Sequence, residues 1–182
     1  MPYLNDMPLE TRIALLNRRD AGKTAQDILK PALDLMTQKI ALVSSFGADS
    51  AVLLHMVAQI APKTPVLFID TLMLFRATLN YQKQLTKHLD LENVNHISPN
   101  PGRVFLQDTE GLMHQSNTDA CCTLRKVEPL QQALLPFSAW ITGRKRHQSA
   151  TRADMAIWEA DAAGRLKLNP LANWSKHDIT AY

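Results

Sequence analysis

The chain has 182 residues, of which 46% are hydrophobic and 20% charged, and its formal net charge at pH 7 is +3. This composition is that of a globular domain with a full hydrophobic core, and so small a positive charge gives no argument for nucleic-acid binding. No segment reaches the roughly 18 uncharged apolar residues of a membrane-spanning helix, and the first residues lack the basic and apolar regions of a signal peptide. We therefore expect a soluble cytoplasmic protein with no membrane and no nucleic-acid partner.

Two helices are predicted at the start of the chain, over residues 9–19 and 24–36, because apolar residues recur there at spacings of three and four. A short buried strand is predicted at 40–43, followed by a polar loop and by a helix over 51–60 with an apolar face. Residues 64–71, TPVLFIDT, form a continuous apolar run, which is typical of a parallel strand buried on both faces.

The same alternation of strands and helices continues along the chain. The further predicted elements are a helix at 77–90, a weaker strand at 92–98, a helix at 128–135 and a fourth strand at 139–143. This order favours an α/β fold with an open, mostly parallel sheet flanked by helices. No repeat, low-complexity tract or linker divides the chain, so we expect a single domain over residues 1–182, in which 1–38 are N-terminal helices.

The last residues read as the beginning of a helix. Ser175 is a suitable N-cap for a helix that opens at 178–182, and no C-cap, glycine or polar tail follows it. We therefore expect an interrupted domain, one that is truncated at the C-terminus.

A loop of small polar residues, SSFGADS, lies between the first predicted strand and the next helix. Ligands of α/β sheets bind at the carboxyl ends of strands, and a helix N-terminus offers unpaired N–H groups and a partial positive charge. Ser44, Ser45 and Ser50 add hydroxyl donors, and Gly47 lets the backbone approach an oxyanion closely. The pattern is equally typical of a plain helix start with Asp49 or Ser50 as N-cap, and the spacing alone does not decide between a phosphate loop and this turn.

The only two cysteines, Cys121 and Cys122, are adjacent and are followed closely by Arg125 and Lys126. A disulfide between adjacent residues is strained, so two core thiols or two metal ligands are the better interpretations. Positive charge near the pair would favour the thiolate form that binds zinc or iron–sulfur clusters. Such a site normally needs four protein ligands, and no histidine lies at a short spacing that clearly completes it.

Four stretches together are similar to one family. SSFGADSAVLLH, CCTLRKVEPL, AWITGRKRHQSATRADM and KLNPLANWSKHDITAY resemble, in this order, the assimilatory adenylylsulfate (APS) reductases and their relatives that reduce phosphoadenylylsulfate (PAPS). The polar loop resembles the PP-loop of the ATP-pyrophosphatase superfamily, whose pattern is close to Ser-Gly-Gly-x-Asp-Ser. The resemblance implies the PP-loop fold, also called adenine nucleotide alpha hydrolase-like, with residues 39–182 as an incomplete nucleotide-binding core.

The resemblance implies an activity, a cofactor and a partner. The family reduces APS to sulfite and AMP in sulfate assimilation: a catalytic cysteine near the C-terminus attacks the sulfur, and thioredoxin or a glutaredoxin-like dithiol protein releases sulfite. Members with a Cys-Cys pair and a later Cys-x-x-Cys hold a [4Fe–4S] cluster and usually prefer APS. Cys121 and Cys122 would thus be two of four cluster ligands. Whether the protein forms a homo-oligomer stays open.

The resemblance also implies the substrate-binding residues. The loop would surround the nucleotide, Thr71 would lie near the adenosine, and Gly143 would let the ribose or adenine approach. Lys126 would lie between cluster and substrate, and guanidinium groups after the fourth strand would face the phosphosulfate. The expected set is Ser44, Ser45, Phe46, Gly47, Asp49, Ser50, Thr71, Lys126, Gly143, Arg144 and Arg152.

The chain departs from the family pattern at several places. Phe46 replaces the first glycine of the loop, from which we expect less room and a ligand with a smaller anionic group than the triphosphate of ATP. Leu72 replaces a glycine after the second strand, which we expect to alter the turn there because leucine does not take positive φ cheaply. The second cysteine pair and the nucleophile are absent from the sequence, so we assign no catalytic residue and expect no turnover by the chain alone.

Three alternatives to an APS reductase stay open. The first is a PAPS reductase of the same family. The second is another PP-loop enzyme that uses ATP to adenylate a substrate; such enzymes often carry a lysine where this chain has Ala48. The third is a non-catalytic nucleotide-binding remnant.

Overall fold

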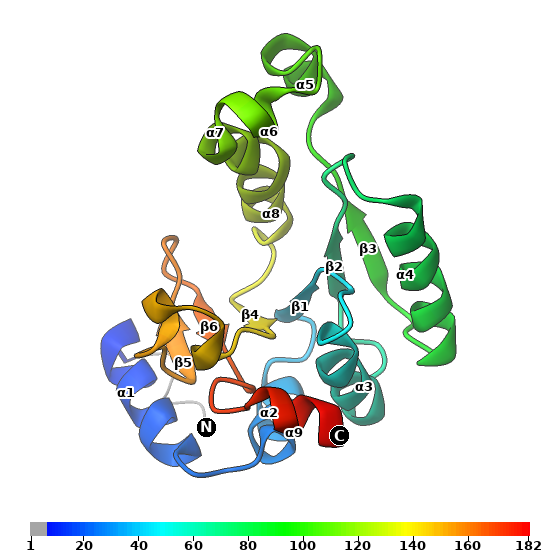
Figure 1. The fold of residues 1–182 in the computed structure, drawn as a ribbon. Helices are drawn as coiled ribbons and strands as arrows, with labels where there is room; N and C mark the ends of the chain where they lie inside the picture. Colours follow the sequence, from blue (N-terminus) through cyan, green and yellow to red (C-terminus); the bar gives the residue numbers. More distant parts are fainter. Residues whose placement is uncertain (1–6) are drawn as a thin grey trace.

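The structure is a computed structural model that describes residues 7–182. Its centre is a six-stranded sheet in the order β3-β2-β1-β4-β6-β5, parallel throughout except for β5, which runs antiparallel to β6 (Figure 1). The strands are β1 Ile40–Ser44, β2 Val66–Ile69, β3 Val94–Ile97, β4 Ala139–Thr142, β5 Trp158–Ala160 and β6 Leu166–Leu168. This arrangement confirms the predicted open, mostly parallel α/β sheet.

Helices connect the strands and cover both faces of the sheet. The helices are α1 Leu9–Asp20, α2 Ala25–Leu35, α3 Ser50–Ile60, α4 Arg76–His88, α5 Pro101–Gln107, α6 Met113–Ser116, α7 Thr118–Cys122, α8 Glu128–Ala133 and α9 Lys176–Ala181. Between α7 and α8 the chain continues as a π-helical segment, η2, over Thr123–Val127. Two short 3₁₀ turns, η3 Arg146–Gln148 and η4 Ala150–Arg152, follow β4.

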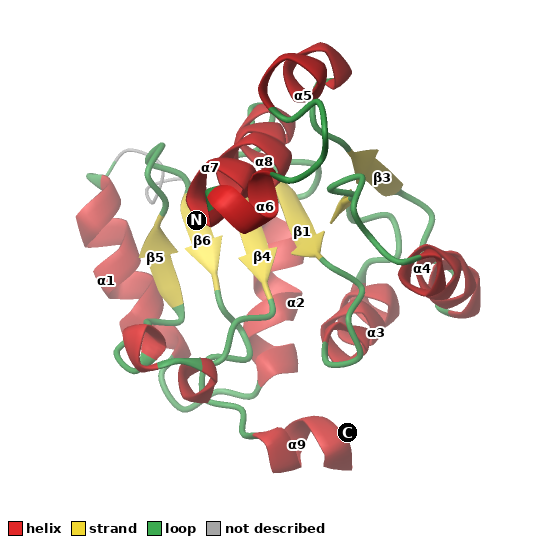
Figure 2. Cartoon of the chain, turned by 45° about the horizontal axis from the view of Figure 1, so that its top comes forward, coloured by secondary structure: helices red, strands yellow, loops and turns green. Residues whose placement is uncertain are grey.

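The two faces of the sheet are covered to different depths. Ile40 and Leu42 of β1 belong to the large core, which also contains the apolar faces of α2 and α3. Ala41 points to the opposite face, as the two-residue period of a strand requires, and there it joins a small cluster beside α8. Figure 2 shows α2 on one side of the sheet and α8 on the other. The side that carries α8 is therefore thinly covered, and it leaves room for cavities.

The C-terminal helix α9 is docked onto the helix that follows the polar loop. Ser175 and Asp178 form a reciprocal capping box at its start, which confirms Ser175 as the N-cap. The ring of Tyr182 contacts Trp174 edge-on, and its hydroxyl lies 2.9 Å from Nδ1 of His55 on α3. The last residue of the chain thus contacts α3, the helix that begins at the polar loop.

Several elements differ from the sequence-based expectation. The predicted strand at 64–71 is shorter, since only Val66–Ile69 pair in the sheet. Strands β5 and β6 were not predicted, because each has three residues and a polar residue interrupts each apolar pattern. The helical pieces from α5 to η2 are too short to show a clear period, so the sequence predicts none of them.

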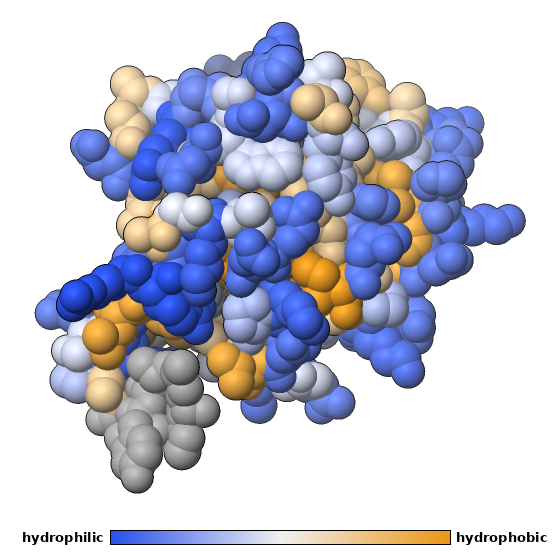
Figure 3. All heavy atoms as spheres, turned by 90° about the horizontal axis from the view of Figure 1, so that it is seen from below, coloured by the Kyte–Doolittle hydropathy of each residue, from blue (hydrophilic) through white to orange (hydrophobic). Residues whose placement is uncertain are grey.

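In the view of Figure 3, hydrophobic side chains form small separate patches among hydrophilic ones. Every helix among residues 7–182 is too short or too polar to cross a lipid bilayer.

Candidate functional site

A cavity of about 600 Å³ opens at the carboxyl ends of β1, β2 and β4. Parallel strands place their carboxyl ends at one edge of the sheet, which is where α/β folds bind ligands. The cavity brings together ten expected substrate-binding residues from four separate stretches of the chain. They are Ser44, Ser45, Gly47, Asp49, Ser50, Thr71, Lys126, Gly143, Arg144 and Arg152.

Phe46, the remaining expected residue, does not line the cavity. Its side chain is 1% exposed and packs edge-on against Phe68, with the ring centroids 5.2 Å apart. Its backbone takes φ of 52°, and its N–H donates to Oγ of Ser44 at 3.1 Å. The expectation that the Phe46 side chain narrows the loop is therefore wrong, because the left-handed backbone turns the ring into the core and away from the cavity.

The loop presents its polar groups to the cavity at the start of α3. The backbone N–H of Ser50 donates to the carbonyl of Gly47 at 2.8 Å, which closes a tight turn. Asp49 occupies the N-cap position, but its side chain makes no capping hydrogen bond. The plain helix start considered from the sequence therefore does not account for Asp49, whose carboxylate is instead 3.2 Å from Nζ of Lys145.

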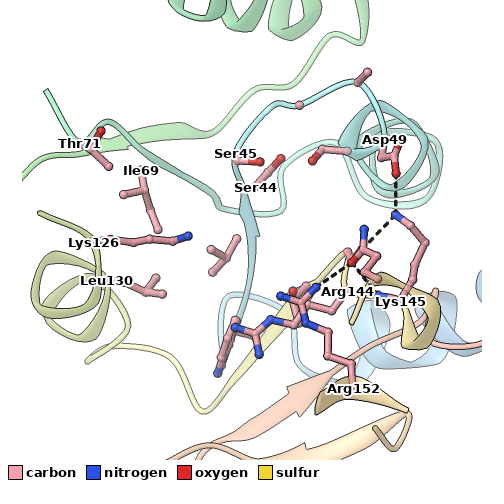
Figure 4. A pocket seen from close by; sticks show the side chains of 18 of the residues that line it. Ser44, Ser45, Asp49, Ile69, Thr71, Lys126, Leu130, Arg144, Lys145 and Arg152 are labelled. Atoms are coloured by element: carbon pink, nitrogen blue, oxygen red, sulfur yellow. Dashed lines mark hydrogen bonds and ion pairs between the residues drawn. The ribbon is translucent and has the colours of Figure 1, made fainter. Parts of the chain in front are cut away.

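Four basic side chains line the cavity with these hydroxyls. Figure 4 shows Lys126 extending from one wall, while Arg144 and Arg152 lie along another and Lys145 meets Asp49. Arg152 donates to Oε1 of Gln148 at 2.9 Å. Hydroxyls, a helix N-terminus and cations converging on one space suit an anion with several oxygens.

Arg144 also lies near a carboxylate outside the cavity. Burial alone would raise the pKa of Glu159, but hydrogen bonds from Lys167 and Asn169, together with the positive charges of Lys167 and Arg144, lower it below its ordinary value of 4.5. Glu159 is therefore ionised at neutral pH and attracts the Arg144 guanidinium.

Lys145 and Gln148 are cavity residues that the sequence analysis did not select. Both lie inside the stretch GRKRHQS, from which the family resemblance implies only Gly143 and Arg144 as binding residues. The signal that could have found them is position, because residues just after a buried strand face the carboxyl edge of the sheet. Nothing in the spacing distinguishes the buried Lys145, at 1% exposed, from its basic neighbours.

Arg125 does not serve the cysteine pair as expected. Its guanidinium is buried, forms a hydrogen-bonded ion pair with Asp108 at 2.6 Å, and donates to the carbonyl oxygen of Thr71 at 3.0 Å. The hydrogen bonds from Arg125, with one from the backbone of Met113, lower the pKa of Asp108 below its ordinary 3.8. The charge of Arg125 is thus compensated by Asp108, and the residue links the η2 segment to the end of β2.

The two thiols lie at the end of α7, next to the π-helical turn. Both are free; Cys121 is buried and Cys122 is exposed. Within residues 7–182, no three His, Cys, Asp or Glu side chains gather as a metal site would require. The sequence contains no further cysteine, so the residues present supply two thiolates and do not by themselves fit a cluster that needs four ligands.

Comparisons with known proteins point in one direction. A family model described as the phosphoadenosine phosphosulfate reductase domain matches residues 39–182. Among curated proteins, an adenosine 5′-phosphosulfate reductase of Mesorhizobium japonicum is 48% identical over 88% of this chain, and one of Chelativorans sp. is 44% identical over 96%. The chain spans 63% and 73% of the lengths of these two relatives.

The solved structures agree in fold. A phosphoadenylyl-sulfate reductase of Candida auris, solved as a phosphate complex, has a TM-score of 0.79 and 26% identity and matches 94% of this chain and 84% of its own. An NH₃-dependent NAD synthetase of Campylobacter jejuni is similar in fold alone, with a TM-score of 0.57 and 16% identity over 96% of this chain and 72% of its own. Both neighbours agree with the PP-loop fold inferred from the loop.

Proposed function

Since the chain belongs to the phosphoadenosine phosphosulfate reductase family, we propose that it binds adenosine 5′-phosphosulfate and takes part in the reduction of this substrate to sulfite and AMP. The observation that carries the proposal is the cavity at the carboxyl edge of the sheet, where three serines and four basic side chains converge beside the start of α3. The relatives from Mesorhizobium and Chelativorans, both named adenosine 5′-phosphosulfate reductases, support this substrate.

In this proposal the binding residues act on the two halves of the substrate. The serine hydroxyls and the N–H groups at the start of α3 donate to the phosphate, while Arg144 and Arg152 neutralise the sulfonyl oxygens. Thr71 and Gly143 border the adenosine. Neutralising these oxygens makes the sulfur more open to attack by an anionic nucleophile, because less negative charge repels it.

The reduction itself needs two electrons and a nucleophile. Sulfur passes from the sulfonyl state to sulfite, AMP leaves with the bridging oxygen, and a dithiol is oxidised to a disulfide. We assign the dithiol to a protein of the thioredoxin or glutaredoxin class and the setting to the cytoplasm, where thiols remain reduced. We assign neither Cys121 nor Cys122 as the nucleophile, since the resemblance matches both to cluster ligands. We therefore expect no sulfite release from the 182-residue chain with APS, thioredoxin and its reductant; thioredoxin-dependent release would contradict this assignment.

We propose that Cys121 and Cys122 are two of the four ligands of a [4Fe–4S] cluster whose other two ligands the residues present do not supply, and this proposal is tested separately from the substrate. If Cys121 and Cys122 are two ligands of a [4Fe–4S] cluster, anaerobic reconstitution of this chain should leave far less than four irons per chain after gel filtration. A full complement of four irons would contradict the ligand count. The Cys121→Ser/Cys122→Ser variant measures the background of loosely bound iron.

Binding is the direct test of the proposed function. Titration calorimetry should show that the chain binds APS and AMP. Replacement of Arg144 by Met should lower the affinity for APS by about tenfold. The matched control is Arg103→Met, which removes an exposed arginine outside this cavity and should leave the affinity unchanged. Absence of any AMP or APS binding by the unaltered chain would contradict the proposal.

Two alternatives give different results in the same titration. A PAPS reductase, the name carried by a relative of Gloeobacter violaceus that is 32% identical, would bind the 3′-phosphorylated substrate more tightly than APS. An ATP-dependent adenylating enzyme would bind ATP with magnesium in preference to both. We expect the order APS over PAPS over ATP, because the Cys-Cys pair accompanies APS preference in the family that the sequence resembles.

A further inference from the structure

Lys145 is an unusual residue of the cavity wall, because its side chain is almost fully buried. It is 1% exposed, although an ammonium group is expensive to remove from water without a partner. Its Nζ lies 3.2 Å from Oδ2 of Asp49 and 3.5 Å from the carbonyl oxygen of Gly143. The backbone N–H of Lys145 is held by Oε1 of Gln148 at 3.2 Å. The ammonium group is therefore fixed in one place.

Asp49 poses an electrostatic problem for an anion site. It is the acidic residue among those that line the cavity, and 58% of its side chain is exposed. Its carboxylate does not cap α3, so no backbone N–H of that helix compensates the charge. An anion bound at the loop would be repelled by this carboxylate, because both groups would carry negative charge in the same cavity.

The ion pair resolves this conflict. We infer that Lys145 is a positioning residue that neutralises Asp49 and so allows an anionic phosphate group to bind at the loop. The inference rests on the proposed nucleotide site and assigns Lys145 an indirect role, through Asp49, in contrast to the direct contacts of Arg144 and Arg152. Figure 4 shows the pair on the side of the cavity opposite Lys126.

Neutralisation of Asp49 predicts a specific pattern of affinities for AMP. Lys145→Met should weaken AMP binding by about tenfold, because the carboxylate is left uncompensated. Asp49→Asn should bind AMP at least as tightly as the unaltered chain. The double variant should return to within about threefold of the unaltered chain, since the repelling charge is gone.

Adenosine separates charge from shape in this experiment. It lacks the phosphate, so each variant should bind adenosine as the unaltered chain does. If Lys145 only held the loop in shape, Lys145→Met would weaken the binding of AMP and of adenosine alike. Adding Asp49→Asn would then not restore the affinity for AMP. Lys30→Met is the matched control, because Lys30 forms an ion pair at the same 3.2 Å with Asp34 outside the cavity.

Each outcome bears on the inference. An unchanged AMP affinity in Lys145→Met, or a double variant as weak as Lys145→Met, would overturn it. Should Lys145→Met fail to fold, Asp49→Asn alone tests the inference. A tenfold loss of AMP affinity in Asp49→Asn would mean that Asp49 itself holds the ligand and would overturn the inference. A chain that binds no AMP at all instead refutes the proposed function, so the two failures are distinct.

Discussion

Leu72 shows how a single residue keeps a turn that its side chain disfavours. Its φ is 60°, in the left-handed region, and its N–H donates to Oδ1 of Asp70 at 2.9 Å. The sequence led us to expect an altered turn because the family pattern has glycine here. The chain instead takes the glycine-like conformation with a leucine, at a cost of roughly 1 kcal/mol.

Leu72→Gly should therefore stabilise the chain by about 0.5–1 kcal/mol, since the strain is removed and the exposed side chain loses little packing. Urea unfolding measures the change. Met73→Gly is the matched control, because Met73 is also exposed but does not have a positive φ. We expect this change to destabilise the chain by about 0.5–1 kcal/mol. A destabilised Leu72→Gly would contradict the strain.

At the scale of elements, Arg125 joins the α7–η2–α8 segment to the end of β2, beside the cavity. The guanidinium joins Asp108, just after α5, to the Thr71 carbonyl at the end of β2. One side chain thus joins the helical segment that carries the thiols and Lys126 to the end of strand β2, which borders the cavity.

Arg125→Met should lower the melting temperature by roughly 5–10 °C, because it leaves the Asp108 carboxylate without its partner. It should also weaken AMP binding, as Thr71 and Lys126 lose their common anchor. Arg103→Met removes an exposed ion pair with Glu128 and should change the melting temperature by about 1 °C or less. Equal effects of the two substitutions would argue against the anchor.

At the scale of the whole molecule, α1 is tied to the far edge of the sheet by a buried carboxylate. Asp20 is fully buried and accepts hydrogen bonds from Arg19, Lys23 and Nε1 of Trp158 in β5. Burial alone would raise the pKa of Asp20, but these hydrogen bonds lower it below its ordinary value of 3.8. Helix α1 is thus joined to β5, the edge strand of the sheet.

Because the folded-state pKa of Asp20 is depressed, its contribution to stability is present above the unfolded value and is lost as the pH falls through the folded value. Asp20→Asn should destabilise the chain by about 2 kcal/mol at pH 7. The difference from the unaltered chain should shrink as the pH falls below 3.8, in chemical unfolding at a series of pH values. A difference that is constant down to pH 2 would contradict the assignment.

The sequence predicted which residues gather at the cavity better than it predicted the surroundings of that cavity. Nine of the ten expected lining residues lie in three of the stretches that resemble the family, and Thr71 follows the second predicted strand, since the carboxyl edge of a parallel sheet brings distant loops together. The direction of Phe46 could not be predicted, because it depends on a left-handed φ that the residue type disfavours. The ion-pair partners of Arg125 and Lys145 could not be predicted either. Each pair joins residues that are far apart in the sequence, and no helical or strand periodicity relates their positions.

The π-helical turn at Thr123–Val127 also restricts how this region can change in length. The hydrogen bonds of a π-helix span five residues where those of an α-helix span four, and such bulges inside α-helices are frequent at functional sites. Loss of one residue from this stretch would let α7 and α8 merge into a regular helix and would rotate the thiols relative to Lys126. Surface loops tolerate insertions and deletions, whereas here a single codon gained or lost would reorient one wall of the cavity.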